Sequence, residues 1–316
     1  SGHDACYSIK FNDVGDIYVA GGTRSDNFFT TNEAVQTGHN NTSEADGFVT
    51  RFSSDVSGVL QSTLLGTTLY DQAYFLQVDR FNKVHVLGQT RGNLTPSSNT
   101  FNNPNSGQFI MRLNDELSII ELQTVFGNGN GLVNISPTAF LVDICGNVYV
   151  SGWGAGIAGS LHQTTPLSGM PVTPNAFQST SGDGYNFYLI VLSRNMEGIL
   201  YGSYLGGGQA REHVDGGTSR FDKKGIVYHS ACGGCGGYSD FPTMPSDVWS
   251  LTNQSTNCNN LVFKFDIEII PRANFTLNQI DGCAPLLVEF ENNSSSSTNY
   301  LWDFGNGDTT SVIFNP

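Results

Sequence analysis

The stretch "TAFLVDICGNVYVSGWG" (residues 138–154) decides the fold class of this chain. Apolar and polar residues alternate in both of its halves, and an Asp-x-x-Gly-Asn segment separates them. Asp, Gly and Asn supply the backbone angles that a tight turn needs, whereas β-branched residues resist those angles. The stretch therefore predicts a β-hairpin.

The same hairpin pattern occurs three more times along the chain. The other copies are "YSIKFNDVGDIYVAGGT" (7–23), "YFLQVDRFNKVHVLGQT" (74–90) and "GTSRFDKKGIVYHSACG" (217–233). The equivalent positions are 67, 64 and 79 residues apart, and they are Tyr18, His85, Tyr149 and Tyr228. Each of the first three hairpins is followed by an apolar third strand and by a fourth strand that ends at or near a Gly.

Four strands in each repeat and the absence of helical periodicity predict an all-β fold, a β-propeller with four-stranded blades. The blades are expected near 7–67, 74–128, 138–208 and 217–268, so that the propeller repeats cover residues 1–268. A β-sandwich is the alternative, although a sandwich does not require a full four-strand repeat. The fourth repeat lacks a Gly-terminated fourth strand, and we expect segments outside this chain to complete the ring.

A second module follows a short linker at 269–273 and occupies residues 274–316. Its segments "LLVEF" and "NYLWDF" alternate as strands do, and "GNGD" supplies a turn. About 43 residues are too few to form a stable core unaided. We therefore expect the natural chain to continue beyond Pro316.

Composition and motifs narrow the function. The chain has 28 acidic and 14 basic residues, a net charge of −14 and no basic cluster, which argues against nucleic acid and anionic membranes as partners. No apolar run is long enough to predict insertion into a membrane. The sequence contains no H-E-x-x-H, no G-x-S-x-G and no phosphate-binding Gly-rich loop, so we predict that it is not an enzyme.

Two families share motifs with this chain. The segment from Gly282 to Pro316 resembles the first half of a PKD domain, an immunoglobulin-like β-sandwich of extracellular proteins, and carries its W-x-F-G-x-G turn at residues 302–307. The upstream repeats resemble the bacterial SBBP β-propeller repeats, whose hairpin reads D-x-x-G-N-x-Y-V-x-G. The third repeat matches best, whereas Asn82-Lys83 and Gly225-Ile226 replace Gly-Asn in the second and fourth repeats.

Together these modules resemble the large surface proteins of Bacteroidota that the type IX secretion system exports and that are described as gliding motility-associated or adhesin-like. The resemblance implies a secreted or cell-surface location and a role in adhesion or in assembly of a surface structure. The implied partners are other cell-surface or secretion-system proteins, or surface glycans. The alternative is an accessory carbohydrate-binding module of a secreted degradative enzyme whose catalytic domain lies elsewhere.

Three cysteines lie between the second and third expected strands of the fourth repeat, namely Cys232, Cys235 and Cys258. An extracellular location favours a disulfide that joins Cys258 to Cys232 or Cys235 and clamps a long Gly-rich loop. The alternative is a tetrahedral zinc site formed by these cysteines and His213. We favour the disulfide and expect no cofactor; calcium bound by hairpin-turn carboxylates is a further alternative, although Asx-turns explain these residues more simply.

Aromatic residues are expected in or beside loops on the face that carries these cysteines. Tyr and Trp combine a large apolar surface with a polar atom, so exposed rings there could stack on sugars. The candidates are Trp153, Tyr185, Tyr238, Phe241 and Trp249.

Overall fold

The computed structural model describes residues 2–41, 43–154, 167–182, 186–244, 246–267, 269, 273–294, 297, 299–305 and 310–315. The chain forms two compact units, Ser1–Phe265 and Asp266–Pro316. Each unit is described separately below.

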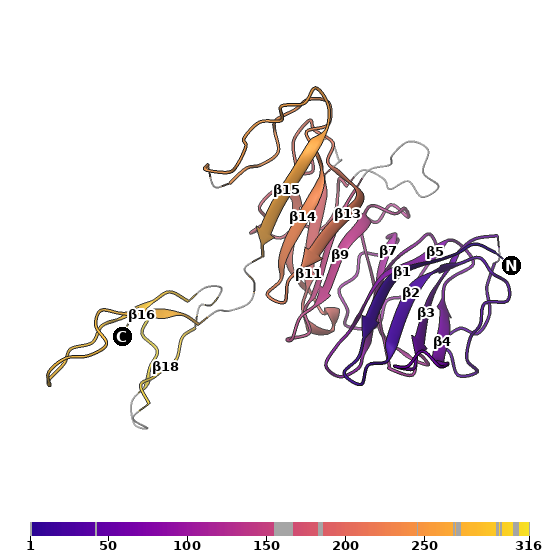
Figure 1. Cartoon of the computed structure of the whole chain (residues 1–316), viewed down its shortest axis with the longest axis horizontal. Coiled ribbons are helices and arrows are strands. Elements are labelled where there is room, and N and C mark those ends of the chain that lie inside the picture. The colour runs from indigo at the N-terminus through magenta and orange to yellow at the C-terminus, as the bar shows by residue number, and fades with distance from the viewer. Residues whose placement is uncertain are drawn as a thin grey trace. The chain divides into compact units, whose positions relative to one another are not determined.

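The first unit consists of antiparallel sheets in which strands adjacent in sequence are adjacent in space (Figure 1). The first sheet contains β1 (Asp4–Phe11), β2 (Ile17–Thr23), β3 (Asp46–Phe52) and β4 (Val59–Leu65). The second contains β5 (Asp71–Val78), β6 (Val84–Thr90), β7 (Gln108–Leu113) and β8 (Ile120–Phe126). The third contains β9 (Ser136–Val142), β10 (Val148–Trp153), β11 (Phe187–Leu192) and β12 (Ile199–Leu205). The predicted all-β class and four-stranded antiparallel sheets are therefore confirmed.

The fourth sheet has three strands, β13 (His213–Phe221), β14 (Ile226–Gly233) and β15 (Asn259–Asp266). Strand β15 forms its edge, and within the described part of the chain no further strand pairs with it. Exposed and half-buried residues alternate along most of β15. The only helical element among the described residues is the single turn η1 (Arg194–Met196).

The hydrophobic core lies between successive sheets rather than inside any one of them. One cluster joins the first sheet to the second and includes Val49, Leu76 and Val86. Another joins the second sheet to the third and includes Ile110 and Val150. Because such a sheet is covered on both faces, β6 and β11 are buried along their whole length. Strand β11 is apolar throughout, as expected for such a strand, whereas β6 also buries the polar residues His85, Gln89 and Thr90.

The glycine of the Y-V-x-G pattern allows two strands to approach closely. A Cβ atom on Gly21 or Gly88 would clash with the carbonyl oxygen of Ala5 or Gln72 in the preceding strand, and Gly152 approaches Ser136 in the same way. The register of the first hairpin shifts between Cys6 and Ser8, and the equivalent hairpin of the second sheet shifts in the same way. The glycine is thus required by the bulged hairpin geometry.

The hairpin turns are held by side-chain carboxylates. In three turns one carboxylate oxygen accepts two backbone N–H groups at 2.8–3.1 Å, and the residues are Asp79, Asp143 and Asp222. These are the Asx-turns expected from the sequence. Because these oxygens already accept backbone hydrogen bonds, the turns need no calcium ion to explain their carboxylates.

The second unit contains two short strand pairs. Strand β16 (Phe275–Leu277) pairs with β17 (Phe290–Asn292), and β18 (Trp302–Asp303) pairs with β19 (Thr310–Ser311). The ring of Trp302 contacts those of Phe275 and Phe290 at centroid distances of 5.5 and 5.7 Å. The Trp302 indole N–H donates to the carbonyl of Ile313 at 3.0 Å, which ties the W-x-F-G-x-G segment to the chain that follows it.

Candidate functional site

The candidate site lies where the first strand of each sheet begins beside the end of the second. The strand pairs that mark this end are Asp4 with Thr23, Asp71 with Thr90, Ser136 with Trp153 and His213 with Cys232. The segments between second and third strands, and the connections from one sheet to the next, emerge here. We call these four sheet ends the loop face.

A disulfide joins Cys235 to Cys258 across the segment between β14 and β15. The sequence had left Cys232 and Cys235 open as partners of Cys258, and the structure pairs Cys235. We call residues 235–258 the disulfide loop. Cys283, in the second unit, is an exposed free cysteine.

The four residues of the zinc alternative lie close together. His213 and Cys232 are cross-strand partners, and His213 Nδ1 is 3.8 Å from Cys235 Sγ. Two of the three sulfurs form the disulfide, however, and metal binding requires free thiolates. In the described part of the chain, no group of three or more His, Cys, Asp or Glu side chains is placed to hold a metal ion.

The disulfide loop carries exposed apolar side chains. Trp249 is fully exposed, and the exposed fractions of Met244, Leu251 and Tyr238 are 72%, 54% and 40%. The loop nevertheless has internal structure, because Asn253 Nδ2 donates to the carbonyls of Gly234 at 2.9 Å and of Asn257 at 2.6 Å. These exposed apolar side chains make the disulfide loop the candidate binding surface of the loop face.

The predicted aromatic residues differ in exposure. Tyr238 and Trp249 are exposed, Phe241 is half-buried with its ring 5.5 Å from that of Phe263, and Tyr185 lies outside the described residues. The expectation of an exposed ring does not hold for Trp153, which is 8% exposed and lies 5.9 Å from the His213 ring. Packing between the third and fourth sheets covers it. Sequence reasoning missed Met244 and Leu251, because a single apolar residue in a loop carries no periodic signal.

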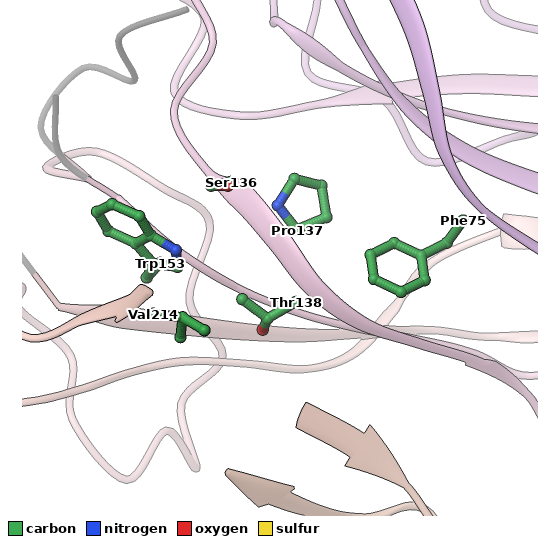
Figure 2. A pocket seen from close by; sticks show the side chains of 6 residues that line it. All are labelled: Phe75, Ser136, Pro137, Thr138, Trp153 and Val214. Atoms are coloured by element: carbon green, nitrogen blue, oxygen red, sulfur yellow. The ribbon is translucent and has the colours of Figure 1, made fainter. Parts of the chain in front are cut away.

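A small pocket of about 180 Å³ lies at the start of β9 on the loop face (Figure 2). Figure 2 shows Trp153 and Phe75 on either side of the β9 residues Ser136, Pro137 and Thr138. Its volume is below the range of about 300–1,000 Å³ that is usual for ligand pockets. Among its described lining residues, the polar groups are the Ser136 and Thr138 hydroxyls and the Trp153 indole, and none is an acid or a base.

A larger pocket of about 460 Å³ lies between the first two sheets. Arg24 and Arg91 line it, and the Arg91 guanidinium lies 5.8 Å above the Tyr70 ring. The buried Oε1 of Gln72, another lining residue, has no hydrogen-bond partner. This pocket has no signature in the sequence, because its residues come from five separate segments.

Buried acids hold the connections between sheets. The backbone N–H of Thr67 donates to Asp71 Oδ2 at 2.6 Å, and that of Gly207 donates to Glu212 Oε2 at 3.3 Å. Burial raises the pKa of Asp71 to about 6 and that of Glu212 to about 7. These positions were not singled out from the sequence, which shows neither burial nor proximity.

Comparison with known proteins yields distant structural neighbours and no family. A scan against protein-family models and a search of curated proteins found no match. The solved structures that match include a glucose dehydrogenase, with 12% sequence identity and a TM-score of 0.31. The match covers 73% of this chain and 80% of the glucose dehydrogenase chain. They also include a PL25 ulvan lyase, with 11% sequence identity and a TM-score of 0.37. That match covers 93% of this chain and 63% of the lyase chain. Similarity at this level carries no argument about the activity of this chain.

No helix among the described residues combines the length and the apolar character that crossing a membrane requires.

Proposed function

We propose that this chain is a non-enzymatic module of a secreted or cell-surface protein, and that it serves in adhesion or in the assembly of an extracellular surface structure. The observation that carries the proposal is the disulfide loop, which carries three exposed apolar side chains, those of Met244, Trp249 and Leu251. Trp is enriched among residues that dominate binding energy at interfaces, and Met also favours binding surfaces. A disulfide limits the conformational entropy that such a loop loses on binding.

The finer architecture belongs to the same proposal. The sheets stack face to face through buried clusters, as blades of a propeller do, and the open edge of β15 would accept a fourth strand from a segment outside these residues. The aromatic cluster around Trp302 supports assignment of the second unit to the first half of a PKD module that acts as a stalk. The partners would be surface proteins of the same cell envelope.

A binding assay tests the proposal. The purified chain is immobilised, and its affinity for isolated outer envelopes and for a glycan array is measured. The test variant combines Met244→Ser, Trp249→Ser and Leu251→Ser in the disulfide loop. The matched control combines Val14→Ser and Ile144→Ser, two exposed residues in hairpin turns at the opposite sheet ends.

We expect saturable binding of the parent chain to envelopes. The affinity of the loop variant should be at least tenfold weaker, and that of the control variant should be unchanged. Equal binding by both variants would contradict the loop as the recognition surface. Loop-dependent binding confined to polysaccharides on the array would favour the alternative, a carbohydrate-binding accessory module of a degradative enzyme.

A further inference from the structure

The connection between the third and fourth sheets brings three oxygen-bearing side chains together. Asn186 precedes β11, Glu212 precedes β13 and Asp240 belongs to the disulfide loop. All three lie against the glycine segment 206–208 that follows β12. A Cβ atom on Gly206 would clash with the Asn186 amide, and one on Gly207 would clash with the Asp240 carboxylate.

Only part of each side chain has a hydrogen-bond partner. Glu212 Oε2 accepts from Asn186 Nδ2 at 3.0 Å and from the backbone N–H of Gly207 at 3.3 Å. Asn186 Nδ2 also donates to the carbonyl of Gly207 at 2.8 Å. Asp240 Oδ2 accepts from the backbone N–H groups of Gln209 and Ala210 at 2.7 and 3.4 Å.

The remaining oxygens are buried and have no donor. They are Oδ1 of Asn186, Oε1 of Glu212 and Oδ1 of Asp240. Asn186 is fully buried and Glu212 is 1% exposed. Each carboxylate is thus satisfied at one oxygen only, and a buried oxygen without a hydrogen-bond donor is unfavourable, so the geometry points to a positive group beside these oxygens. Burial and, to a smaller extent, the charge of Asp240 raise the pKa of Glu212.

The equivalent connection between the first and second sheets is built differently. Asp46 lies at the start of β3 as Asn186 lies at the start of β11. Asp71 accepts a backbone N–H from the connection after β4, as Glu212 does from the connection after β12. There, His39 Nδ1 lies 3.4 Å from Asp46 Oδ2, although Oδ1 of Asp46 and Oδ1 of Asp71 are also buried without a hydrogen-bond partner. At the connection between the second and third sheets, Gly107 and Asn134 stand at these positions, and neither carries a charge.

We propose that Asn186, Glu212 and Asp240 bind a hard divalent cation, Ca²⁺, which fastens the disulfide loop to the third and fourth sheets. The donors are oxygens only, which suits Ca²⁺ and disfavours Zn²⁺. Three protein oxygens leave positions for the carbonyls or waters that complete a shell of six to eight ligands. The described residues contain no cluster of three or more His, Cys, Asp or Glu side chains that could hold a metal ion. The present group is not such a cluster, because one of its three members is the amide of Asn186.

The cation site does not depend on the proposed function, whereas its consequence for binding does. Asp240 lies five residues after Cys235, so a cation held there would restrict the part of the disulfide loop that begins at the disulfide. If the loop recognises a surface component, recognition would then depend on calcium.

Calcium titration of the chain, after removal of metals with EDTA, tests the site directly. Isothermal titration with CaCl₂ should show one equivalent bound, and thermal unfolding should shift to a higher temperature on addition of millimolar Ca²⁺. Glu212→Gln and Asp240→Asn should each weaken the affinity roughly tenfold or more, because Ca²⁺ affinity follows the number of charged ligands. Asp71→Asn, at the equivalent connection, is the matched control and should bind Ca²⁺ as the parent chain does.

Asp240 is half-buried in a loop, so Asp240→Asn keeps the test valid if Glu212→Gln fails to fold. Absence of calcium binding by the parent chain would overturn the proposal, as would undiminished binding by Asp240→Asn. Stabilisation by Glu212→Gln in a chain that binds no calcium would show that a proton, rather than a cation, occupies the site. Calcium binding is measured by the heat of titration and by the unfolding temperature. Failure of the cation site is therefore distinguishable from failure of the envelope-binding assay that tests the proposed function.

Discussion

His229 shows how a single residue couples two neighbouring sheets. Its ring stacks on Phe263 at 4.7 Å and contacts Phe187 at 5.0 Å, and its nitrogens lie 2.9 and 2.7 Å from the hydroxyls of Ser151 and Ser219. Burial lowers its pKa to about 4. The ring is therefore neutral in the folded chain over the physiological pH range, where it serves as a structural group.

We predict that His229 makes the fold sensitive to acid. The unfolded chain protonates this residue near its ordinary pKa of 6.5, whereas the folded chain does so only near 4. Stability is thus lost as the pH falls from about 6.5 to about 4, by up to about 3 kcal/mol. His229→Phe should lower the free energy of unfolding by about 1–3 kcal/mol at pH 8, because two hydroxyls lose their partner, and should flatten the acid dependence. Urea unfolding at several pH values measures both; a parallel pH profile in the variant would contradict this role.

Glu212 is predicted to act in the opposite direction in the absence of calcium. Its pKa is raised from 4.5 to about 7 in the folded chain, so folding favours the protonated form. Stability is fully present below about pH 4.5 and falls by up to about 3 kcal/mol as the pH rises through 7. In EDTA, Glu212→Gln should therefore unfold at higher temperature than the parent chain at pH 8 and at a similar temperature at pH 4. Identical profiles in the two proteins would show that the burial of Glu212 is relieved in solution.

At the scale of the element, the hairpins were predictable because their signal is local. Asp143 Oδ1 accepts the backbone N–H groups of Cys145 and Asn147 at 2.8 Å, and Asp, Gly and Asn all lie within a few residues of each other in sequence. The position of each second strand could be predicted from this turn. The exposure of Trp153 could not be predicted, because it depends on contact with the fourth sheet, which begins some 60 residues later at His213. The acids at the sheet connections were missed for the same reason.

The turn carboxylates can be tested one at a time. Asp143→Ala should destabilise the chain by about 2–3 kcal/mol, since it removes an acceptor for two backbone amides and for the Tyr149 hydroxyl. Asp143→Asn retains one carbonyl oxygen and should cost less. Ile144→Ser, in the same turn and 75% exposed, is the control and should change stability by less than about 0.5 kcal/mol. Equal effects of Asp143→Ala and Ile144→Ser in chemical denaturation would exclude the Asx-turn as a stabilising element.

The disulfide loop is the other element with a clear prediction. Closing a loop of 23 residues is worth about 3 kcal/mol by chain entropy, so the double variant Cys235→Ser, Cys258→Ser should be less stable by up to that amount. The loop should also be cleaved faster in limited proteolysis. Cys145→Ser, which removes an exposed thiol outside the disulfide, should leave both properties unchanged. Unchanged proteolysis of the double variant would mean that internal hydrogen bonds alone order the loop.

At the scale of the molecule, the first unit is a stack of twisted sheets with its connections gathered at the loop face. The repeated four-stranded pattern was readable from the sequence, since each sheet is built from contiguous residues. The stacking of the sheets could be inferred only from the repetition of the pattern. The exposure of the loop side chains could not be predicted, because it depends on contacts between sheets. Under the proposed function, the packed sheets would hold the disulfide loop in place for recognition.

The most direct test is a hydrogen-exchange footprint of the chain bound to isolated outer envelopes. The account predicts slower exchange in residues 236–257 on binding, with the hairpin turns around Val14 and Ile144 unchanged. Protection of the hairpin turns with an unaffected disulfide loop would contradict it.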